Sequence, residues 1–188
     1  MIYPFLRRNL DILFVGLNPA NTSSKKGHYF STNQSFWNQL YESGLIKEHI
    51  DKDVADNVVF GSSSINHHNY EYGITDLVNY LAESNSSIVK PTLKNCIRLQ
   101  EDIMLYKPRI VVLLHSKVVK CFVNEYLKKN ITKGYAGKLL DNCNTVFYYV
   151  PFPHGNSICT NIKVAIYADI KKTLDNDTLW RSNNYRFR

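Results

Sequence analysis

The sequence predicts a single-domain α/β fold, a three-layer sandwich in which a short, mostly parallel central sheet of about four strands lies between helices. Residues 12–15 form a β-branched and aromatic run that breaks at Gly16, and an amphipathic helix begins near Gln34. Residues 109–114 are an almost unbroken apolar run, which is typical of a parallel strand buried on both faces. The alternation of such strands with helical patterns indicates a parallel sheet.

The other elements follow from periodicity and from residues that begin or end helices. Residues 33–43 place Phe36 and Trp37 on the apolar face of a helix that Gly44 ends, so we expect this pair to lie in the core. Residues 45–72 show no clear long element. The remaining expected elements are an amino-terminal arm at 1–10, an extended segment at 73–78, helices at 91–107, 116–128 (with Ser116 as N-cap) and 158–174, a basic loop at 130–144 and a strand at 145–150.

Length and composition indicate one domain with a sizeable core. The chain has 188 residues, of which 44% are hydrophobic and 13% are aromatic. We expect the domain to span residues 1–175 and residues 176–188 to form a basic carboxyl-terminal tail. No apolar run approaches the roughly 18–20 residues that span a bilayer, and residues 1–8 lack the hydrophobic region of a signal peptide. We therefore expect a cytoplasmic protein without a membrane anchor, and we expect it to be a monomer.

The charge of the chain favours a polyanionic partner. The formal net charge is +7, and neutralising phosphates with lysine and arginine releases condensed counterions. Several lysines fall in loops that the predicted fold places near strand ends. If these loops share one rim of the sheet, they make a phosphate-facing surface. These lysines are Lys25, Lys26, Lys117, Lys133 and Lys138.

The cysteines and histidines form no spaced metal-binding pattern. The cysteines, which are Cys96, Cys121, Cys143 and Cys159, lack Cys-x-x-Cys spacing, which indicates reduced thiols and argues against an iron–sulfur cluster. The adjacent residues His67 and His68 would point in divergent directions on a regular backbone, so we favour a surface loop there. His115 follows the strand at 109–114 and is expected to bond the backbone at the edge of the core. We expect no metal and no cofactor.

The loop after the first strand is the strongest candidate for a site. In an open α/β sheet, ligands bind beyond the carboxyl ends of the strands. Asn18 precedes Pro19, which favours an extended conformation, so its carboxamide can project from the rim and hold a water molecule. Tyr29 and Phe30 follow in a segment without a regular period. A planar base could stack on one of these rings, although both could instead fill the top of the core.

These residues carry a resemblance to a known family. Residues 16–46, GLNPANTSSKKGHYFSTNQSFWNQLYESGLI, resemble the first motif region of the uracil-DNA glycosylase superfamily, specifically its mismatch-specific uracil and thymine DNA glycosylase branch. The family pattern is Gly-aliphatic-Asn-Pro, then Gly-His-aromatic-aromatic, then Phe-Trp opening a helix that ends in Gly-Leu. Segments at 72–78, 106–112 and 150–157 resemble the later motifs in order and spacing. The resemblance covers roughly residues 10–172 and implies a uracil-DNA glycosylase-like fold.

The resemblance implies roles for residues on the first two strand ends. Asn18 would position the attacking water, with the backbone around Leu17 close to the base. Phe30 would stack on the base. Asp76 would read the Watson–Crick edge by accepting a hydrogen bond from a base N–H. From the residues alone, Asp76 could equally be the N-cap of a helix that begins at Leu77.

The terminal loop matches the family with departures. His154 matches a family serine, and its imidazole could donate a hydrogen bond to the leaving base oxygen, so Asn18 and His154 are the catalytic candidates. Phe152 replaces a polar residue, and Asn156 stands at the position of the wedge that fills the gap left by the flipped nucleotide. Asn156 is neither large and apolar nor an arginine. Contacts with DNA are expected from Lys25, Lys26, Lys117, Lys138, Gly155, Asn156 and Ser157.

The resemblance implies a monofunctional DNA glycosylase that hydrolyses the N-glycosidic bond of uracil, or of a related deaminated or mismatched base, by base flipping and water activation. The departures in the terminal loop leave two alternatives within this fold. One is a hypoxanthine-specific glycosylase, and the other is a non-catalytic protein that binds nucleic acid. A hydrolase of free nucleosides is a third alternative, and it predicts no salt-dependent affinity for DNA.

Overall fold

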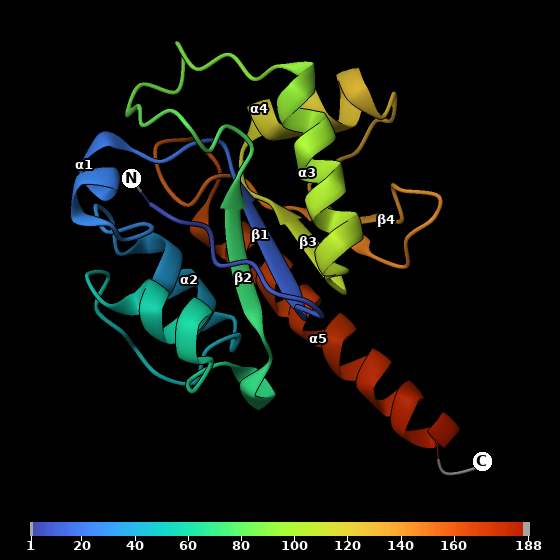
Figure 1. Cartoon of the computed structure of the whole chain (residues 1–188). Coiled ribbons are helices and arrows are strands. Elements are labelled where there is room, and N and C mark those ends of the chain that lie inside the picture. The colour runs from blue at the N-terminus through green and yellow to red at the C-terminus, as the bar shows by residue number, and fades with distance from the viewer. Residues whose placement is uncertain (1, 186–188) are drawn as a thin grey trace.

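A central sheet organises the chain, of which the computed structural model describes the backbone of residues 2–185 and the side chains of residues 2–176. The sheet has five strands in the order β2-β1-β3-β5-β4. They are β1 (Ile12–Gly16), β2 (Tyr72–Asp76), β3 (Ile110–Leu113), β4 (Gly134–Gly137) and β5 (Val146–Tyr149). All neighbouring strands are parallel except β4, which runs antiparallel to β5. The prediction of an α/β fold with a mostly parallel sheet is confirmed (Figure 1).

The sheet has one strand more than the sequence predicted. Residues 134–137 lie in the segment predicted as a basic loop, yet they pair with β5 at the edge of the sheet. Gly134 and Gly137 have φ values of 95° and 71°, which residues with a side chain rarely adopt. Because this short segment has a glycine at each end and no alternation of apolar and polar residues, only its pairing with β5 identifies it as a strand.

The remaining elements are helices. They are α1 (Asn21–Lys26), α2 (Ser35–Glu42), the π-helix η1 (Asn57–Ser62), the 3₁₀ helix η2 (His67–Asn69), α3 (Leu93–Tyr106), α4 (Ser116–Val118), the π-helix η3 (Val119–Tyr126) and α5 (Thr160–Tyr185). No helix among these described elements is both long and apolar enough to cross a membrane.

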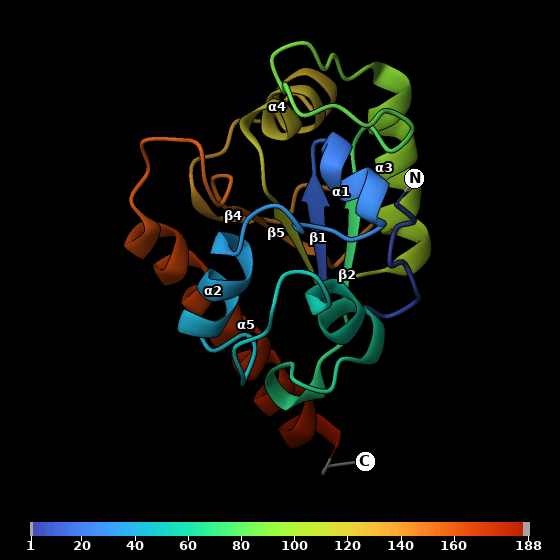
Figure 2. The same cartoon turned by 90° about the vertical axis from the view of Figure 1, so that its left-hand side faces the viewer.

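Helices cover both faces of the sheet and bury a separate core on each. On one face, α2, α5 and η1 pack on Phe14 of β1, and Phe36 and Trp37 are buried there as predicted. On the other face, α3 and η3 pack on Leu13 and Val15. Successive side chains of a strand point to opposite faces, so β1 contributes to both cores. Figure 2 shows the sheet between α2 and α5 on one side and α3 on the other.

Helix α5 is longer than predicted. It begins at Thr160, passes the predicted end at residue 174 and continues to Tyr185. Its apolar stripe includes Tyr167, Ile170 and Leu174, which are fully buried. Beyond these residues the sequence is mostly polar, and its apolar residues Leu179 and Trp180 do not continue the stripe, so the apolar period that predicts a helix ends before the helix does. The last three residues of the predicted basic tail, 186–188, lie outside the described residues.

Residues 45–72 contain the short helices η1 and η2 and several turns but no long element, as predicted. The Nδ2 of Asn66 donates to the carbonyl oxygens of Val59 (2.9 Å) and Tyr70 (2.8 Å), and Ile46 forms an isolated bridge with Asn66. The segment also carries Asp56, whose side chain is completely buried. This carboxylate holds part of the site described next.

Candidate active site

A pocket of about 780 Å³ opens at the carboxyl ends of the parallel strands. Residues following β1, β2, β3 and β5 line it, together with Tyr29, Phe30 and part of the loop at 83–87. Asn18, Phe30, Asp76 and His154, which come from four separate segments, all line this pocket. Leu17 lines it as well. The fold therefore brings together the residues that the sequence selected for catalysis and for binding a base.

The carboxamide of Asn18 is held in one orientation. Its Nδ2 donates to the carbonyl oxygens of Pro19 (2.9 Å) and Glu83 (2.8 Å), and the carbonyl oxygen of Leu81 lies 3.5 Å away. Because carbonyl oxygens only accept hydrogen bonds, the amide nitrogen faces them. Oδ1 is then the atom with which Asn18 can accept a hydrogen bond from a ligand or water in the pocket.

Phe30 gives the pocket an aromatic surface and is supported from behind. Its ring stacks on Phe36 with centroids 4.1 Å apart and an interplanar angle of 22°, and it meets Trp37 edge-on at 6.0 Å. The neighbouring Tyr29 lines the pocket and belongs to the core. Phe30 has a φ of 53°, a conformation that costs a residue with a side chain about 1 kcal/mol or more and persists only where surrounding contacts impose it.

Asp56 supplies such contacts. Its carboxylate accepts hydrogen bonds from the backbone N–H groups of Tyr29 (2.8 Å) and Asn57 (2.9 Å), and it lies 2.9 Å from Nδ1 of His28. The sequence did not reveal this role, because Asp56 lies 27 residues after Tyr29 in a segment without regular periodicity.

The carboxyl group of Asp76 is buried beside the end of β1. Burial raises its pKa to about 7, while the nearby Arg98 guanidinium and a hydrogen bond from the Tyr29 phenol act to lower the pKa. Its Oδ2 has no hydrogen-bond partner among the described residues. The alternative role as a helix N-cap is wrong, because residues 77–92 contain no helix. A buried carboxyl oxygen without a partner, in a pocket, is a position where a ligand can hydrogen-bond.

The loop after β5 presents His154. Burial, followed by the charge of Lys163, lowers the pKa of this imidazole, so it is neutral at pH 7. Its Nδ1 is buried without a hydrogen-bond partner among the described residues. The ring lies 5.0 Å from that of Phe152, which in turn lies 6.1 Å from Phe30 and 5.8 Å from His115. These neighbouring rings therefore form a continuous aromatic wall along one side of the pocket.

Two polar side chains hold this loop from α2 and α5. Gln39 Nε2 and Lys163 Nζ both donate to the carbonyl oxygen of Pro153, at 3.0 and 3.1 Å. Both side chains are almost fully buried, and burial lowers the pKa of Lys163. The sequence alone identified neither residue as part of the site. The available signal was a polar residue on the apolar face of each helix, with Lys163 four residues before the buried Tyr167.

Asn156 holds the same loop from within. Its Nδ2 donates to the carbonyl oxygens of Phe152 (2.7 Å) and His154 (3.2 Å), and its Oδ1 accepts from the backbone N–H of Ile158 (3.1 Å). Gly155 lines the pocket with a φ of 70°, and Ser157 is exposed. The side chain expected to act as a wedge is therefore bonded to its own loop.

Not all of the five lysines share one rim. Lys25 is exposed near the pocket end of the sheet, and Lys26 forms an ion pair with Asp53 (2.8 Å). Lys117 lines the pocket, but its Nζ donates to three backbone carbonyls, those of residues 86, 87 and 89. Lys133 lines the pocket too.

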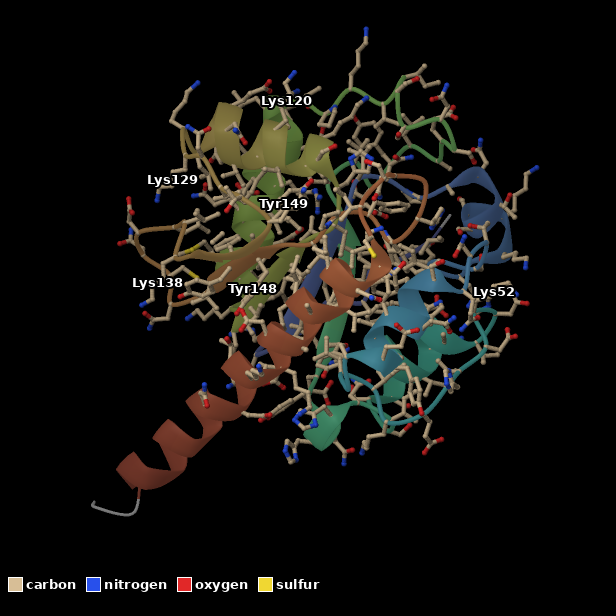
Figure 3. The ribbon with its side chains drawn as sticks, turned by 180° about the vertical axis from the view of Figure 1, so that it is seen from behind. Lys52, Lys120, Lys129, Lys138, Tyr148 and Tyr149 are labelled. Atoms are coloured by element: carbon tan, nitrogen blue, oxygen red, sulfur yellow. The ribbon has the colours of Figure 1, made fainter. Side chains whose placement is uncertain are left out.

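Lys138 lies at the other end of the sheet, which corrects the expectation of a common rim. Because β4 is antiparallel, Gly134 pairs with Tyr149 at the pocket end of β5, whereas Gly137 pairs with Phe147 further from the pocket. Lys138 lines a separate cavity with Pro108 and other residues near the beginning of β3. Figure 3 shows Lys138 level with Tyr148 and below Tyr149.

His115 also belongs to the pocket, a position that its sequence context did not predict. Its Nδ1 accepts the backbone N–H of Lys117 at 3.0 Å and caps α4, the role predicted for Ser116. The expected bond to the backbone is thus present. This bond leaves the ring proton on Nε2. Burial and the charge of Lys117 lower the pKa of His115, so it is a neutral donor in the pocket wall at pH 7.

The pocket suits a planar heterocycle and a water molecule. Phe30 offers a face for stacking, and Asp76 offers a carboxyl group for the edge of a ring. Asn18 offers an acceptor oxygen for water, and His154 offers a neutral imidazole. These functions match what is needed to hold a base and supply water to the carbon that bears it.

Comparisons with known proteins agree with this chemistry. A family model described as the uracil DNA glycosylase superfamily matches residues 3–174. A protein of Schizosaccharomyces pombe (strain 972 / ATCC 24843) named G/U mismatch-specific uracil DNA glycosylase is 26% identical over 175 residues. The alignment covers 89% of this chain and 49% of the yeast protein, so the chain spans about half the length of this relative.

Proposed function

Because the chain belongs to the uracil-DNA glycosylase superfamily, we propose that it is a monofunctional DNA glycosylase that removes uracil, or a related deaminated or mismatched base, from DNA. The observation that carries this proposal is the convergence of Asn18, Phe30, Asp76 and His154 on one pocket. The name of the yeast relative supports uracil as the first base to test.

Binding begins with a base that has left the helical stack. Phe30 stacks on the flipped base. Because Phe36 and Trp37 already hold the Phe30 ring in place, little side-chain entropy is lost there when the base binds. Asp76 accepts a hydrogen bond from a base N–H through Oδ2, which has no hydrogen-bond partner among the described residues. A base lacking that N–H would leave the buried carboxylate unpaired, so this contact selects among bases.

Asn18 places the water. With its Nδ2 committed to the carbonyls of Pro19 and Glu83, Oδ1 accepts a hydrogen bond from a water molecule facing the sugar C1′. The bond between C1′ and the base nitrogen breaks through an oxocarbenium-like sugar, and the water oxygen then bonds to C1′. The electron pair of the broken bond stays on the base, and the base anion takes up the proton that the water releases on bonding to C1′.

His154 stabilises the leaving base. A neutral imidazole donates a hydrogen bond to the base oxygen on which negative charge develops, and burial makes this contact stronger than it would be in water. Gln39, Lys163 and Asn156 are positioning residues, because they hold the loop that carries His154.

The surface around the pocket binds the DNA backbone. Lys25, Lys26 and Lys133 lie on the pocket side of the sheet, while Gly155, Asn156 and Ser157 form the tip of the loop after β5. Lys117 contributes through the loop that it braces, since its amine is bonded to three carbonyls. Phosphate contacts of this kind predict a steep fall in affinity with salt, which a hydrolase of free nucleosides would not show.

A single-turnover excision assay tests the function. Labelled oligonucleotides containing uracil, thymine opposite guanine, or hypoxanthine are incubated as single and double strands with excess protein, and abasic sites are cleaved and counted. Asn18→Ala should reduce excision at least a hundredfold and leave DNA affinity largely unchanged. Asn161→Ala, which changes an exposed asparagine on α5, is the matched control and should excise normally. Wild-type rates in Asn18→Ala would contradict the mechanism.

The terminal loop favours one alternative, a non-catalytic protein that binds nucleic acid. Phe152 lies 6.1 Å from Phe30 and narrows the space around the stacking face, and Asn156 is bonded within its loop. Salt-dependent binding to every oligonucleotide without abasic product from any of them would establish this alternative. Product from hypoxanthine alone would identify a hypoxanthine-specific glycosylase.

A further inference from the structure

Three potential metal ligands come together far from the pocket, at the start of β2. Nε2 of His67 lies 2.7 Å from Oδ1 of Asp175 on α5, and Nε2 of His68 lies 3.9 Å from the same oxygen. One ligand atom from each residue lies within 4.8 Å of the other two. The histidines are adjacent in sequence, whereas Asp175 follows His67 by 108 residues, so only the fold creates this group.

The two imidazoles converge because the backbone is irregular. Adjacent side chains diverge on a regular helix or strand, and for this reason the sequence favoured a surface loop over a metal site here. His68 instead has φ 48° and ψ 24°, and Asn69 has φ 54°, both in the left-handed region. This turns the His68 ring toward that of His67, and their centroids are 4.1 Å apart. The expectation of divergent rings is therefore wrong.

We propose that His67, His68 and Asp175 bind one divalent transition-metal ion, with Zn²⁺ as the best fit, and that the ion links the turn at 66–70 to helix α5. Two imidazole nitrogens and one carboxylate oxygen are a common zinc ligand set that leaves a fourth position for water. In a tetrahedral site with bonds of about 2.0 Å, ligand atoms are about 3.3 Å apart. The separations of the two Nε2 atoms from Oδ1 of Asp175, 2.7 and 3.9 Å, lie on either side of that value, and all three ligand atoms lie within 4.8 Å of one another, so side-chain rotations can bring them into place.

The surroundings allow an ion to enter and set its affinity. The His68 side chain is 66% exposed, which gives access from solvent, while that of His67 is 15% exposed. Lys171 Nζ lies 3.5 Å from Oδ2 of Asp175, and Lys47 Nζ donates to Oδ1 of Asn69 at 2.9 Å. Both lysines weaken cation binding by repulsion, but their hydrogen bonds go to Oδ2 of Asp175 and to Asn69, whereas Oδ1 of Asp175 is the oxygen that faces the histidines. This balance predicts binding weaker than that of a four-ligand structural zinc site.

Titration of the metal-free, tag-free full chain with ZnCl₂ in a calorimeter tests the proposal. The expected result is one equivalent bound, with affinity reduced at least tenfold in His68→Ala. His49→Ala is the matched control, because His49 is another exposed histidine and lies outside the cluster. Its affinity should equal that of the wild type. Absence of saturable binding, or equal affinity in His68→Ala, overturns the proposal.

Two further measurements identify the ligands and the structural effect. Co²⁺ in place of Zn²⁺ should give visible absorption without thiolate charge transfer. A thiolate band would assign the ion to cysteine and overturn the proposal. Zn²⁺ should raise the melting temperature of the wild type but not of Asp175→Asn, because an ion that binds only the folded state stabilises it. An equal rise in both proteins overturns the proposed link to α5.

Discussion

Gly16 and Asp76 are paired across β1 and β2 so closely that a Cβ atom on Gly16 would lie 2.3 Å from Oδ1 of Asp76. Real Cβ atoms do not approach other atoms this closely. The glycine at the end of β1 therefore provides the space that the buried carboxyl group occupies. This contact connects the first family motif with the residue proposed to read the base.

Gly16→Ala should displace the Asp76 side chain. We expect a loss of about 1–3 kcal/mol in the free energy of unfolding, as for overpacked cores, and at least a tenfold loss in excision rate. Urea denaturation and single-turnover excision measure the two effects. Gly61→Ala is the control, because its Cβ would meet only the Phe5 ring at 3.7 Å. If both variants behave alike, the contact between Gly16 and Asp76 has no special importance.

Asp76 should make stability fall as pH rises. Its pKa is about 7 in the folded protein and about 3.8 when unfolded, so the folded state binds the proton more tightly between these values. The contribution of Asp76 to the free energy of unfolding is therefore greatest below about pH 4. It declines between about pH 4 and about pH 7, by at most about 4 kcal/mol. The side chain in Asp76→Asn cannot ionise. The free energy of unfolding of this variant, minus that of the wild type, should therefore be more positive at pH 8 than at pH 5. Denaturation curves at both pH values check this, and parallel pH dependence in the two proteins would refute it.

Excision should change with pH in the opposite direction. If ionised Asp76 accepts the base N–H, kcat/KM rises with pH through about 7, where the carboxyl group of the free enzyme ionises. Asp76→Asn should have a lower rate and lack this rise. A pH profile of single-turnover excision under subsaturating conditions makes the measurement. A flat wild-type profile would remove the ionised carboxylate from the mechanism.

The lysines that flank β4 offer a matched test of the DNA-binding surface. Lys133 and Lys138 flank the same short strand, but Lys133 lines the pocket and Lys138 lies toward the other end of the sheet. Lys133→Ala should lower the slope of log affinity against log salt by about 1, as expected for one lost phosphate contact. Lys138→Ala should leave the slope unchanged. The reverse result would place the DNA on a different face.

Lys163→Met should impair catalysis more than stability. Methionine fills a similar volume, and replacing a buried charge with an apolar group is often neutral for stability, but the carbonyl of Pro153 loses one of its two donors. We expect kcat to fall at least fivefold, with KM nearly unchanged and stability altered by about 1 kcal/mol or less. Lys172→Met changes an exposed lysine of the same helix and serves as control. A wild-type kcat would show that Gln39 alone positions the loop.

The sequence predicted the strands and helices that have strong apolar periods. The runs at 12–15 and 109–114 are β1 and β3, and the face containing Phe36 and Trp37 is buried. Elements without such a period were missed or cut short. Strand β4 depends on pairing with β5, and α5 continues past Leu174 through a mostly polar segment. Apolar periodicity identifies elements that bury one face in a core. It therefore does not predict elements, or parts of elements, that other contacts stabilise.

The sequence by itself determined the α/β class, the family and four pocket residues, because motif residues at strand ends are local features of the chain. Only the tertiary structure decided which polar groups hold them. Asp56 reaches Tyr29 across 27 residues, and Gln39 reaches Pro153 across 114. It also decided that Lys138 lies away from the pocket and that His67, His68 and Asp175 meet. These contacts join distant parts of the chain, and no local pattern of residues encodes the distance between two such parts in space.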